Sequence, residues 1–260
     1  MTRPATFAQE VGEEDFHLAR ACLLLSRDDT PTLDVDAQLA RFAPWAERVK
    51  ALRAEGVDVP TALRQALAEE AGFRGAEANE YYLPRNSYLD QVLDTRQGIP
   101  ITLSIVYLEV ARLVNEPLVA MGMPAHFLVR HEETYLDPFH GGREVTRETM
   151  QRLLDGITGG RLTLTPAMLA PTSDREILAR VLANLRNAYL RQGDLPRAIR
   201  TMDRLVELLP DDATLHRDRG LLKHEAGRFP EARIDLEHYL DVFPTARDAE
   251  GIRGILRRLQ

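Results

Sequence analysis

Apolar residues recur at helical spacing along the first part of the chain. Within residues 14–29, apolar side chains return every three or four positions, so that Leu18, Cys22 and Leu25 share one face of a helix. Two further segments with the same spacing follow. The pattern predicts a helical N-terminal region over residues 1–78, with Cys22 packed in its core as a small apolar side chain.

Shorter apolar runs, separated by glycine and proline, follow from Asn79 onward. The stretches LVAMG, AHFLVR and TYLDPFHGG have the length and the flanking residues of strands. Short helices alternate with these runs. The mixture predicts an α+β core with a small antiparallel sheet over residues 79–172, within a chain that is mostly helical.

The last part of the chain repeats itself. Three pairs of identical residues stand 34 positions apart: Gly193 and Gly227, Ala198 and Ala232, and Pro210 and Pro244. This period, with small residues between two helices and a proline after the second, resembles the tetratricopeptide repeat. It predicts αα-hairpins over residues 173–260. An apolar stripe that includes Ile252 and Ile255 predicts a final helix that caps the array.

Composition and charge limit the classes of partner. Hydrophobic residues make up 44% of the chain and charged residues 28%, as in folded soluble proteins. The net charge of −7 argues against nucleic acid as a partner. The chain has no apolar stretch that could span a membrane, and its acidic start does not have the pattern of a signal peptide. We therefore expect a cytoplasmic protein without membrane or nucleic-acid partners.

We expect two segments of the core region to pair as a β-hairpin. The first contains His126 and the second contains Asp137, and the residues between them include Glu132 and Glu133. A loop of even length centred on these two glutamates sets Leu128 opposite Asp137. His126 then lies diagonal to Asp137, about 7 to 8 Å away between backbones, which side chains can span.

The alternation of the hairpin separates apolar from polar side chains. The apolar positions assigned to the core face are Phe127, Val129 and Leu136. His126 and Asp137 fall on the other face, and we expect that face not to be used by the core. A carboxylate beside an imidazole fixes its tautomer and raises its basicity, as in a catalytic triad. The same pair is also compatible with a purely structural hydrogen bond.

A metal site is a second interpretation of this segment. Its candidate ligands are His126, His131, Asp137 and His140, whose side chains suit several metals. However, His126 and His131 are an odd number of residues apart and would point to opposite faces of a strand. The single cysteine also excludes an intramolecular disulfide and a zinc site built on cysteines. We therefore predict neither a metal nor any other cofactor.

Several motifs together resemble a known family. The chain contains "NSYLDQVLDTRQGIPITLSIVYLEVARL", then "MPAHFLVR" and "YLDPFHGG", and then the repeats. This order is similar to the transglutaminase-like core, and more closely to the SirB-type family of bacterial proteins, over residues 10–245. The resemblance implies a fold whose enzymes use Cys, His and Asp for acyl transfer or peptide cleavage. A related core beside an F-box in eukaryotes suggests a function as an adaptor.

The resemblance places His126 and Asp137 at the histidine and aspartate of that family. The position of the nucleophile falls at Pro100, which offers no reactive group. Proline suits the first turn of a helix because its φ is fixed and its missing N–H has no partner there. Thr102 or Ser104 could replace the cysteine, although a hydroxyl needs both a base and an oxyanion hole.

The leading prediction is a non-catalytic, transglutaminase-like protein that binds or regulates other proteins through its core groove and its repeats. Its partner would be a protein or peptide, and self-association is possible. The alternative is an amide or ester hydrolase, or an acyl transferase, that uses Thr102 or Ser104 with His126 and Asp137. The further candidate binding residues are Asn86, Arg130, Tyr135 and His140.

Overall fold

The computed structural model describes residues 6–124 and 126–259. Three parts of the predictions lie outside these residues: the first five residues of the N-terminal region, Ala125 of the hairpin, and Gln260. The chain folds as two compact units. The core unit is Asp15–Val181, and the repeat unit contains the residues up to Glu14 together with those from Leu182 on. None of the helices described is both long and apolar enough to cross a membrane.

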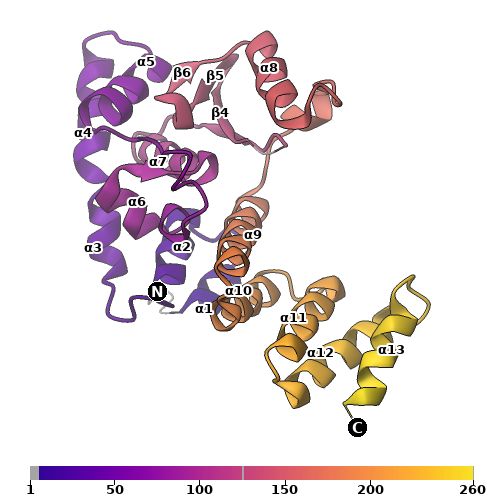
Figure 1. Ribbon diagram of the computed structural model, residues 1–260. Helices are drawn as coiled ribbons and strands as arrows, with labels where there is room; N and C mark the ends of the chain where they lie inside the picture. The colour runs from indigo at the N-terminus through magenta and orange to yellow at the C-terminus, as the bar shows by residue number, and fades with distance from the viewer. Residues whose placement is uncertain (1–5, 125, 260) are drawn as a thin grey trace. The chain divides into compact units, whose positions relative to one another are not determined.

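Helices are the main secondary structure of the core unit (Figure 1). They are α2 (Leu18–Ser26), α3 (Val35–Ala40), α4 (Ala43–Ala54), α5 (Val59–Leu63), α6 (Leu89–Thr95), α7 (Pro100–Leu113), α8 (Arg147–Thr158) and the first half of α9 (Asp174–Gln192). Asp34 and Asp58 cap α3 and α5 because their carboxylates accept backbone N–H groups of the first turn. Helix α5 runs directly into a π-helical segment, η1 (Arg64–Glu70). The predicted burial of Cys22 is confirmed, since it is 2% exposed.

Helix α7 is a buried helix that begins at Pro100, as predicted. The backbone N–H of Ile99 donates to Thr102 Oγ1 at 3.1 Å, which satisfies one of the free donors at the start of the helix. Most of its side chains are buried, including Leu103, Val106 and Tyr107. The helix is therefore a rigid support at the centre of the core unit.

The sheet of the core unit has four antiparallel strands in the order β3-β4-β5-β6. The strands are β3 (Val119–Met121), β4 (Leu128–His131), β5 (Thr134–Asp137) and β6 (Arg143–Glu144). Val129 stands opposite Leu136 and Arg130 opposite Tyr135, which is the predicted register. Glu132 has a φ of +48° in the two-residue loop between β4 and β5. In Figure 1, α7 and α8 flank the strands β4 to β6.

The expectation that one face of the hairpin is free of the core is wrong. Leu128, from that face, belongs to a buried cluster with Met121 and Met150, and Met150 lies on α8. Asp137 is 0% exposed and His126 is 6% exposed. For Leu128 the reason is that α8, which follows the hairpin in sequence, packs on the side that a hairpin considered alone would leave to solvent.

Smaller elements complete the core unit. A parallel pair, β1 (Arg74–Gly75) and β2 (Gln97–Gly98), was not predicted from the sequence. The short 3₁₀ turns are η2 (Pro84–Asn86), η3 (Pro138–His140) and η4 (Pro166–Leu169).

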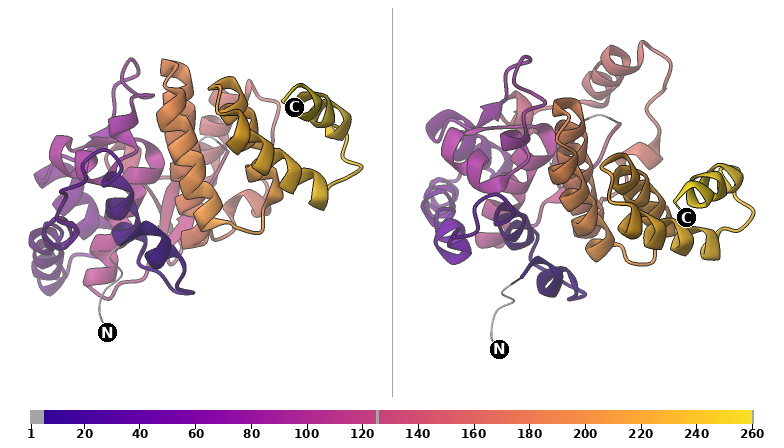
Figure 2. Two further views of the ribbon diagram at one scale, coloured as in Figure 1. Left: turned by 90° about the horizontal axis from the view of Figure 1, so that it is seen from below. Right: turned by 60° about the horizontal axis from the view of Figure 1, so that its bottom comes forward.

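The repeat unit consists of successive helical hairpins, coloured orange to yellow in Figure 2. Its helices are α1 (Phe7–Val11), the second half of α9 (Asp174–Gln192), α10 (Leu195–Leu208), α11 (Ala213–Glu225), α12 (Phe229–Val242) and α13 (Ala249–Arg258). Gly193 and Gly227 take φ values of +72° and +73° at equivalent turns, and Ala198 and Ala232 are both fully buried. The structure thus confirms the repeat.

Both ends of the hairpin array receive further helices. Ile252 of α13 joins a buried cluster with Leu236 and Tyr239 of α12, so the predicted capping helix is confirmed. Helix α1 packs against α10. The guanidinium of Arg204 lies over the ring of Phe7 at 5.6 Å, which ties the two helices together.

Candidate functional site

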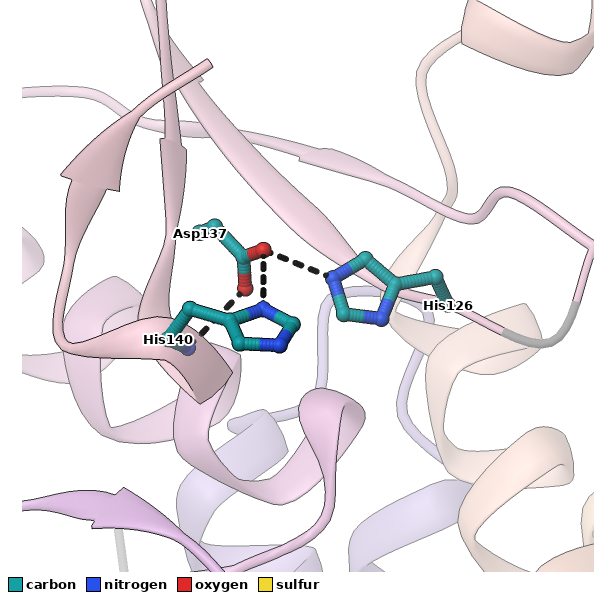
Figure 3. Close-up of side chains that lie close together, drawn as sticks. All are labelled: His126, Asp137 and His140. Atoms are coloured by element: carbon teal, nitrogen blue, oxygen red, sulfur yellow. Dashed lines mark hydrogen bonds and ion pairs between the residues drawn. The ribbon is translucent and has the colours of Figure 1, made fainter. Parts of the chain in front are cut away.

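Three side chains of the core unit meet at one point (Figure 3). His126 precedes β4, Asp137 ends β5, and His140 ends η3. His126 Nε2 lies 3.0 Å from Asp137 Oδ2, and His140 Nδ1 lies 2.6 Å from the same oxygen. The hairpin therefore brings together the imidazole and the carboxylate that the sequence placed diagonally, and it adds a second imidazole. We call these three residues the His–Asp–His cluster.

A tight turn folds His140 back onto Asp137. Asp137 caps the turn, because its Oδ1 accepts the backbone N–H of His140 at 3.2 Å while its Oδ2 accepts from the ring. Pro138 occupies the first position of the turn, where its fixed φ is preorganised. Gly141 ends the turn with a φ of +75°. The sequence DPFHGG thus positions two members of the cluster by local structure alone.

The cluster is a buried carboxylate held by two imidazoles. Burial alone would raise the pKa of Asp137, but its contacts with His126 and His140 outweigh this, and its pKa is lowered. The carboxylate is therefore ionised at neutral pH. The Nε2 of His126 is buried, and among the described residues it has no hydrogen bond of good geometry, because its approach to Asp137 is close but poorly aligned.

Two aromatic side chains lie near the cluster. The ring of Phe139 stands edge-on to those of His126 and His140, with centroid distances of 6.2 and 5.1 Å. The Tyr107 hydroxyl is buried and has no hydrogen-bond partner in the part of the chain described. Burial is the main cause of its raised pKa, and the charge of Asp137 adds to the rise. The sequence alone did not single out Tyr107.

One of the proposed hydroxyl nucleophiles is engaged in other hydrogen bonds, and the other is fully buried. Thr102 Oγ1 donates to the backbone carbonyl of Asn86 at 2.8 Å and accepts from the N–H of Ile99. Ser104 is fully buried, and its hydroxyl makes no hydrogen bond with any described residue. The thiol of Cys22 has its pKa raised to about 12, by burial first and by the charge of Asp174 second. A thiol in that state is a poor nucleophile.

The candidate binding residues other than His140 are engaged elsewhere. Asn86 is 1% exposed, and its side chain donates to the backbone carbonyl of Glu80 at 2.6 Å, so it fixes a loop. Arg130 donates to the carbonyl of Glu132 at 2.7 Å, and its guanidinium lies 6.0 Å from the ring of Tyr135. Arg130 and Tyr135 thus contact one another across the hairpin.

The fourth histidine considered as a metal ligand is held away from the cluster. His131 Nε2 lies 3.7 Å from a carboxylate oxygen of Glu116. This position of His131 agrees with the prediction that its side chain points away from that of His126. His140, which the sequence indicated both as a candidate metal ligand and as a candidate binding residue, is in direct contact with Asp137.

A cavity of about 530 Å³ opens beside the cluster. Its wall includes His140, Phe139 and Tyr81, together with residues of the short parallel pair such as Arg74. Because side chains from distant parts of the sequence form this wall, periodicity gave no signal for it.

A second cavity, of about 380 Å³, was also missed. Glu109 in its wall is buried and accepts hydrogen bonds from His17 Nε2 at 2.8 Å and from the Arg112 guanidinium. Burial would raise the pKa of Glu109, but these bonds lower it. The glutamate at the middle of an otherwise apolar helix was the available signal.

Two family descriptions match the chain. Residues 34–183 match the transglutaminase-like superfamily. Residues 185–257 match the tetratricopeptide repeat.

Relatives match over most of the chain. A UPF0162 protein of Xylella fastidiosa is 34% identical over 95% of this chain and 91% of its own length. A UPF0162 protein of Vibrio cholerae is 29% identical over 92% of each chain. F-box only protein 21 of Pongo abelii is 28% identical over 73% of this chain but only 32% of its own length.

One solved structure is distantly similar. The match to a crystal structure of menin covers 97% of this chain and 68% of the menin chain. The two are 13% identical, and the TM-score is 0.44. The match over residues 34–183 and the relative at 34% identity decide the assignment. The chain belongs to the transglutaminase-like superfamily and, within it, to the UPF0162 proteins, the SirB-type family that its motifs resemble.

Proposed function

We propose that this chain is a non-catalytic member of the superfamily that acts as a protein-binding or regulatory module in the cytoplasm. One observation carries the proposal. Pro100, at the position that the family resemblance assigns to the nucleophile, opens α7 and offers no reactive atom, while His126 and Asp137 remain in contact. A base and its orienting carboxylate do not accomplish acyl transfer without a nucleophile.

The surroundings of Pro100 support the proposal. Thr102 uses its hydroxyl to hold the loop at Asn86, and Ser104 is fully buried. For Thr102 to attack a substrate, its hydrogen bond with Asn86 would have to break, which would leave a buried carbonyl unsatisfied. Cys22 offers a thiol whose pKa is far above neutral.

The repeat unit supports a function in binding proteins. Tetratricopeptide arrays present extended surfaces built from successive hairpins. Several large apolar side chains of α12 and the residue after it are exposed: Phe229, Ile234, Val242 and Phe243. Ile234 is 68% exposed, which is unusual for an isoleucine and is favourable for contact with another protein. Self-association through the same surface is one form such binding could take.

The test measures which proteins the full chain retains from an extract of the cells that produce it. The variant Phe229→Ser/Ile234→Ser removes two exposed apolar groups from the repeat unit. The matched control Ile157→Ser/Leu162→Ser changes two exposed apolar groups of the core unit, which are 48% and 42% exposed. We expect a partner recovered with wild type and control but reduced at least tenfold with the repeat variant. Equal recovery with both variants contradicts a role for the repeats.

The retained His126 and Asp137 favour one alternative, an amide or ester hydrolase or an acyl transferase that uses Thr102 or Ser104. Acyl substrates would be profiled with wild type, His126→Ala, Thr102→Ala and Ser104→Ala. A rate that falls at least about 100-fold with His126→Ala and with one hydroxyl variant would establish the enzyme. Turnover unaffected by His126→Ala removes this mechanism.

A further inference from the structure

We propose that the His–Asp–His cluster binds one divalent transition-metal ion of the zinc class. The ligand atoms would be His126 Nε2, one carboxylate oxygen of Asp137 and His140 Nδ1. This inference goes beyond the proposed function, because ion binding by the core unit does not depend on a protein partner of the repeats.

The donor set and its spacing carry the proposal. The three ligand atoms lie within 4.8 Å of one another, and no other group of this kind occurs among the described residues. Two imidazole nitrogens and a carboxylate oxygen are donors that zinc and related ions accept. Ligands about 2.0 to 2.1 Å from a tetrahedral ion stand about 3.3 Å apart. The present separations of 2.6 and 3.0 Å therefore need to open by less than about 1 Å.

One ligand of the cluster, His140, can move to make this adjustment, while Asp137 is held in place. The His140 side chain is 38% exposed and borders the cavity of about 530 Å³, so its ring can move outward. Asp137 is fully buried and stays fixed, because its second oxygen accepts the backbone N–H of His140. Ligands held by such supporting hydrogen bonds favour metal binding.

An unsatisfied atom points to an occupant. His126 is 6% exposed, and its Nε2 lacks a well-formed hydrogen bond to any described residue. Leaving a buried polar atom unpaired costs about 1 to 3 kcal/mol. An ion placed between the three groups would satisfy His126 Nε2 and neutralise the buried charge of Asp137. Three protein ligands also leave a coordination position open, toward which water could enter from the cavity.

The experiment titrates the metal-free full chain with Zn²⁺ in competition with a chromophoric chelator. A parallel titration with Co²⁺ follows the visible absorption that four-coordinate cobalt gives. We expect one ion per chain. His140→Ala and Asp137→Asn should each lower the affinity at least tenfold, since loss of even a supporting residue costs about 10- to 100-fold.

Two variants serve as controls. His131→Ala changes a histidine of the same hairpin that contacts Glu116, and His216→Ala changes one whose ring lies 4.2 Å from that of His238 in the repeat unit. Neither should change the affinity. Absence of binding by the wild type, or a loss with either control as large as with His140→Ala, overturns the proposal. Partner recovery is measured separately, so failure of one proposal leaves the other testable.

Discussion

Asp137 in the core unit and Asp235 in the repeat unit are both almost fully buried, at 0% and 1% exposure, but different partners neutralise them. Asp137 contacts two imidazoles, and the open cavity lies next to one of them. Asp235, on α12, accepts from the guanidinium of Arg219 at 2.6 Å and from Lys223 Nζ at 2.8 Å. Asp137 has two imidazoles as its charged or polar neighbours, whereas Asp235 has two cationic side chains, with the ring of His216 as a further neighbour at 3.2 Å.

The difference separates a candidate binding site, the His–Asp–His cluster, from a structural ion-pair network. We call this network of Asp235, Arg219 and Lys223 the clamp. Permanent cations beside a buried carboxylate fix one arrangement, and at Asp235 Arg219 and Lys223, together with His216, occupy both carboxylate oxygens. An imidazole beside it can exchange its proton for an ion or a substrate group. We therefore expect substitutions at Asp235 to change stability, and substitutions around Asp137 to change binding more than stability.

The largest effect should follow Asp235→Ala. This change leaves Arg219 and Lys223 as charges buried without their main partner, at a cost of about 3 to 5 kcal/mol in the free energy of unfolding. Chemical denaturation of the full chain measures it. Asp203→Ala is the matched control, because Asp203 also pairs with Arg219 but is 41% exposed and should contribute about 1 kcal/mol at most. Equal losses of stability in Asp235→Ala and Asp203→Ala would contradict the distinction between the buried clamp and an exposed ion pair.

Gly142→Ala tests the packing around the His–Asp–His cluster. Gly142 has a φ of +67°, and a methyl group there would overlap the Tyr107 hydroxyl. The left-handed backbone costs about 1 to 2 kcal/mol and the overlap about 1 to 3 kcal/mol more. Gly141→Ala, with a φ of +75° and nothing within 4 Å, should show only the first cost. Adding Tyr107→Phe to Gly142→Ala should restore part of the stability; no restoration would refute the contact.

The clamp should weaken in acid. Burial would raise the pKa of Asp235, but the hydrogen bonds and charges of Arg219 and Lys223 outweigh this and lower it. Because the folded pKa is below the unfolded one, the stabilisation is fully present well above the unfolded pKa of about 3.9, and it is lost as the pH falls from there through the lowered pKa of the folded state.

The variant Asp235→Asn measures this effect, because it cannot titrate. We expect it to be about 1.5 to 3 kcal/mol less stable than wild type at pH 7, with a gap that narrows toward pH 3. Asp241→Asn, an exposed change on the same helix, should match wild type throughout. A gap that is independent of pH would mean that the charge of Asp235 does not supply the stability.

The smallest effect belongs to Cys22, which lies in the core unit but outside the cluster. Its pKa of about 12 predicts that alkylating reagents at pH 8 modify the thiol only after unfolding. Cys22→Ala should cost about 1 kcal/mol, the value of one buried group of that size. Rapid labelling of the folded chain would contradict this prediction and would show that Cys22 is reactive.

The features that the sequence predicted are those set by local rules. The hairpin register follows from strict alternation and a two-residue loop, so Val129 and Leu136 face each other as expected. The repeat follows from identical residues at a fixed period. Pro100 opens α7 because proline fits only the first turn.

The features that the sequence did not predict depend on tertiary contacts. The pairing of β1 with β2 joins segments that alternation cannot connect. The burial of Leu128, on the face expected to be free of the core, involves Met150 of α8. The ring of His140 reaches Asp137 through a capped 3₁₀ turn, whose hydrogen bonds the residue pattern does not reveal.

The packing of α1 on α10 has a consequence for the order in which this protein forms during translation. The first helix leaves the ribosome 184 residues before its partner, since it ends at Val11 and α10 begins at Leu195. At about 5 to 20 residues per second this delay is roughly 10 to 40 s. The core unit is synthesised entirely within that interval, so it can fold before α10, on which α1 packs, has been synthesised.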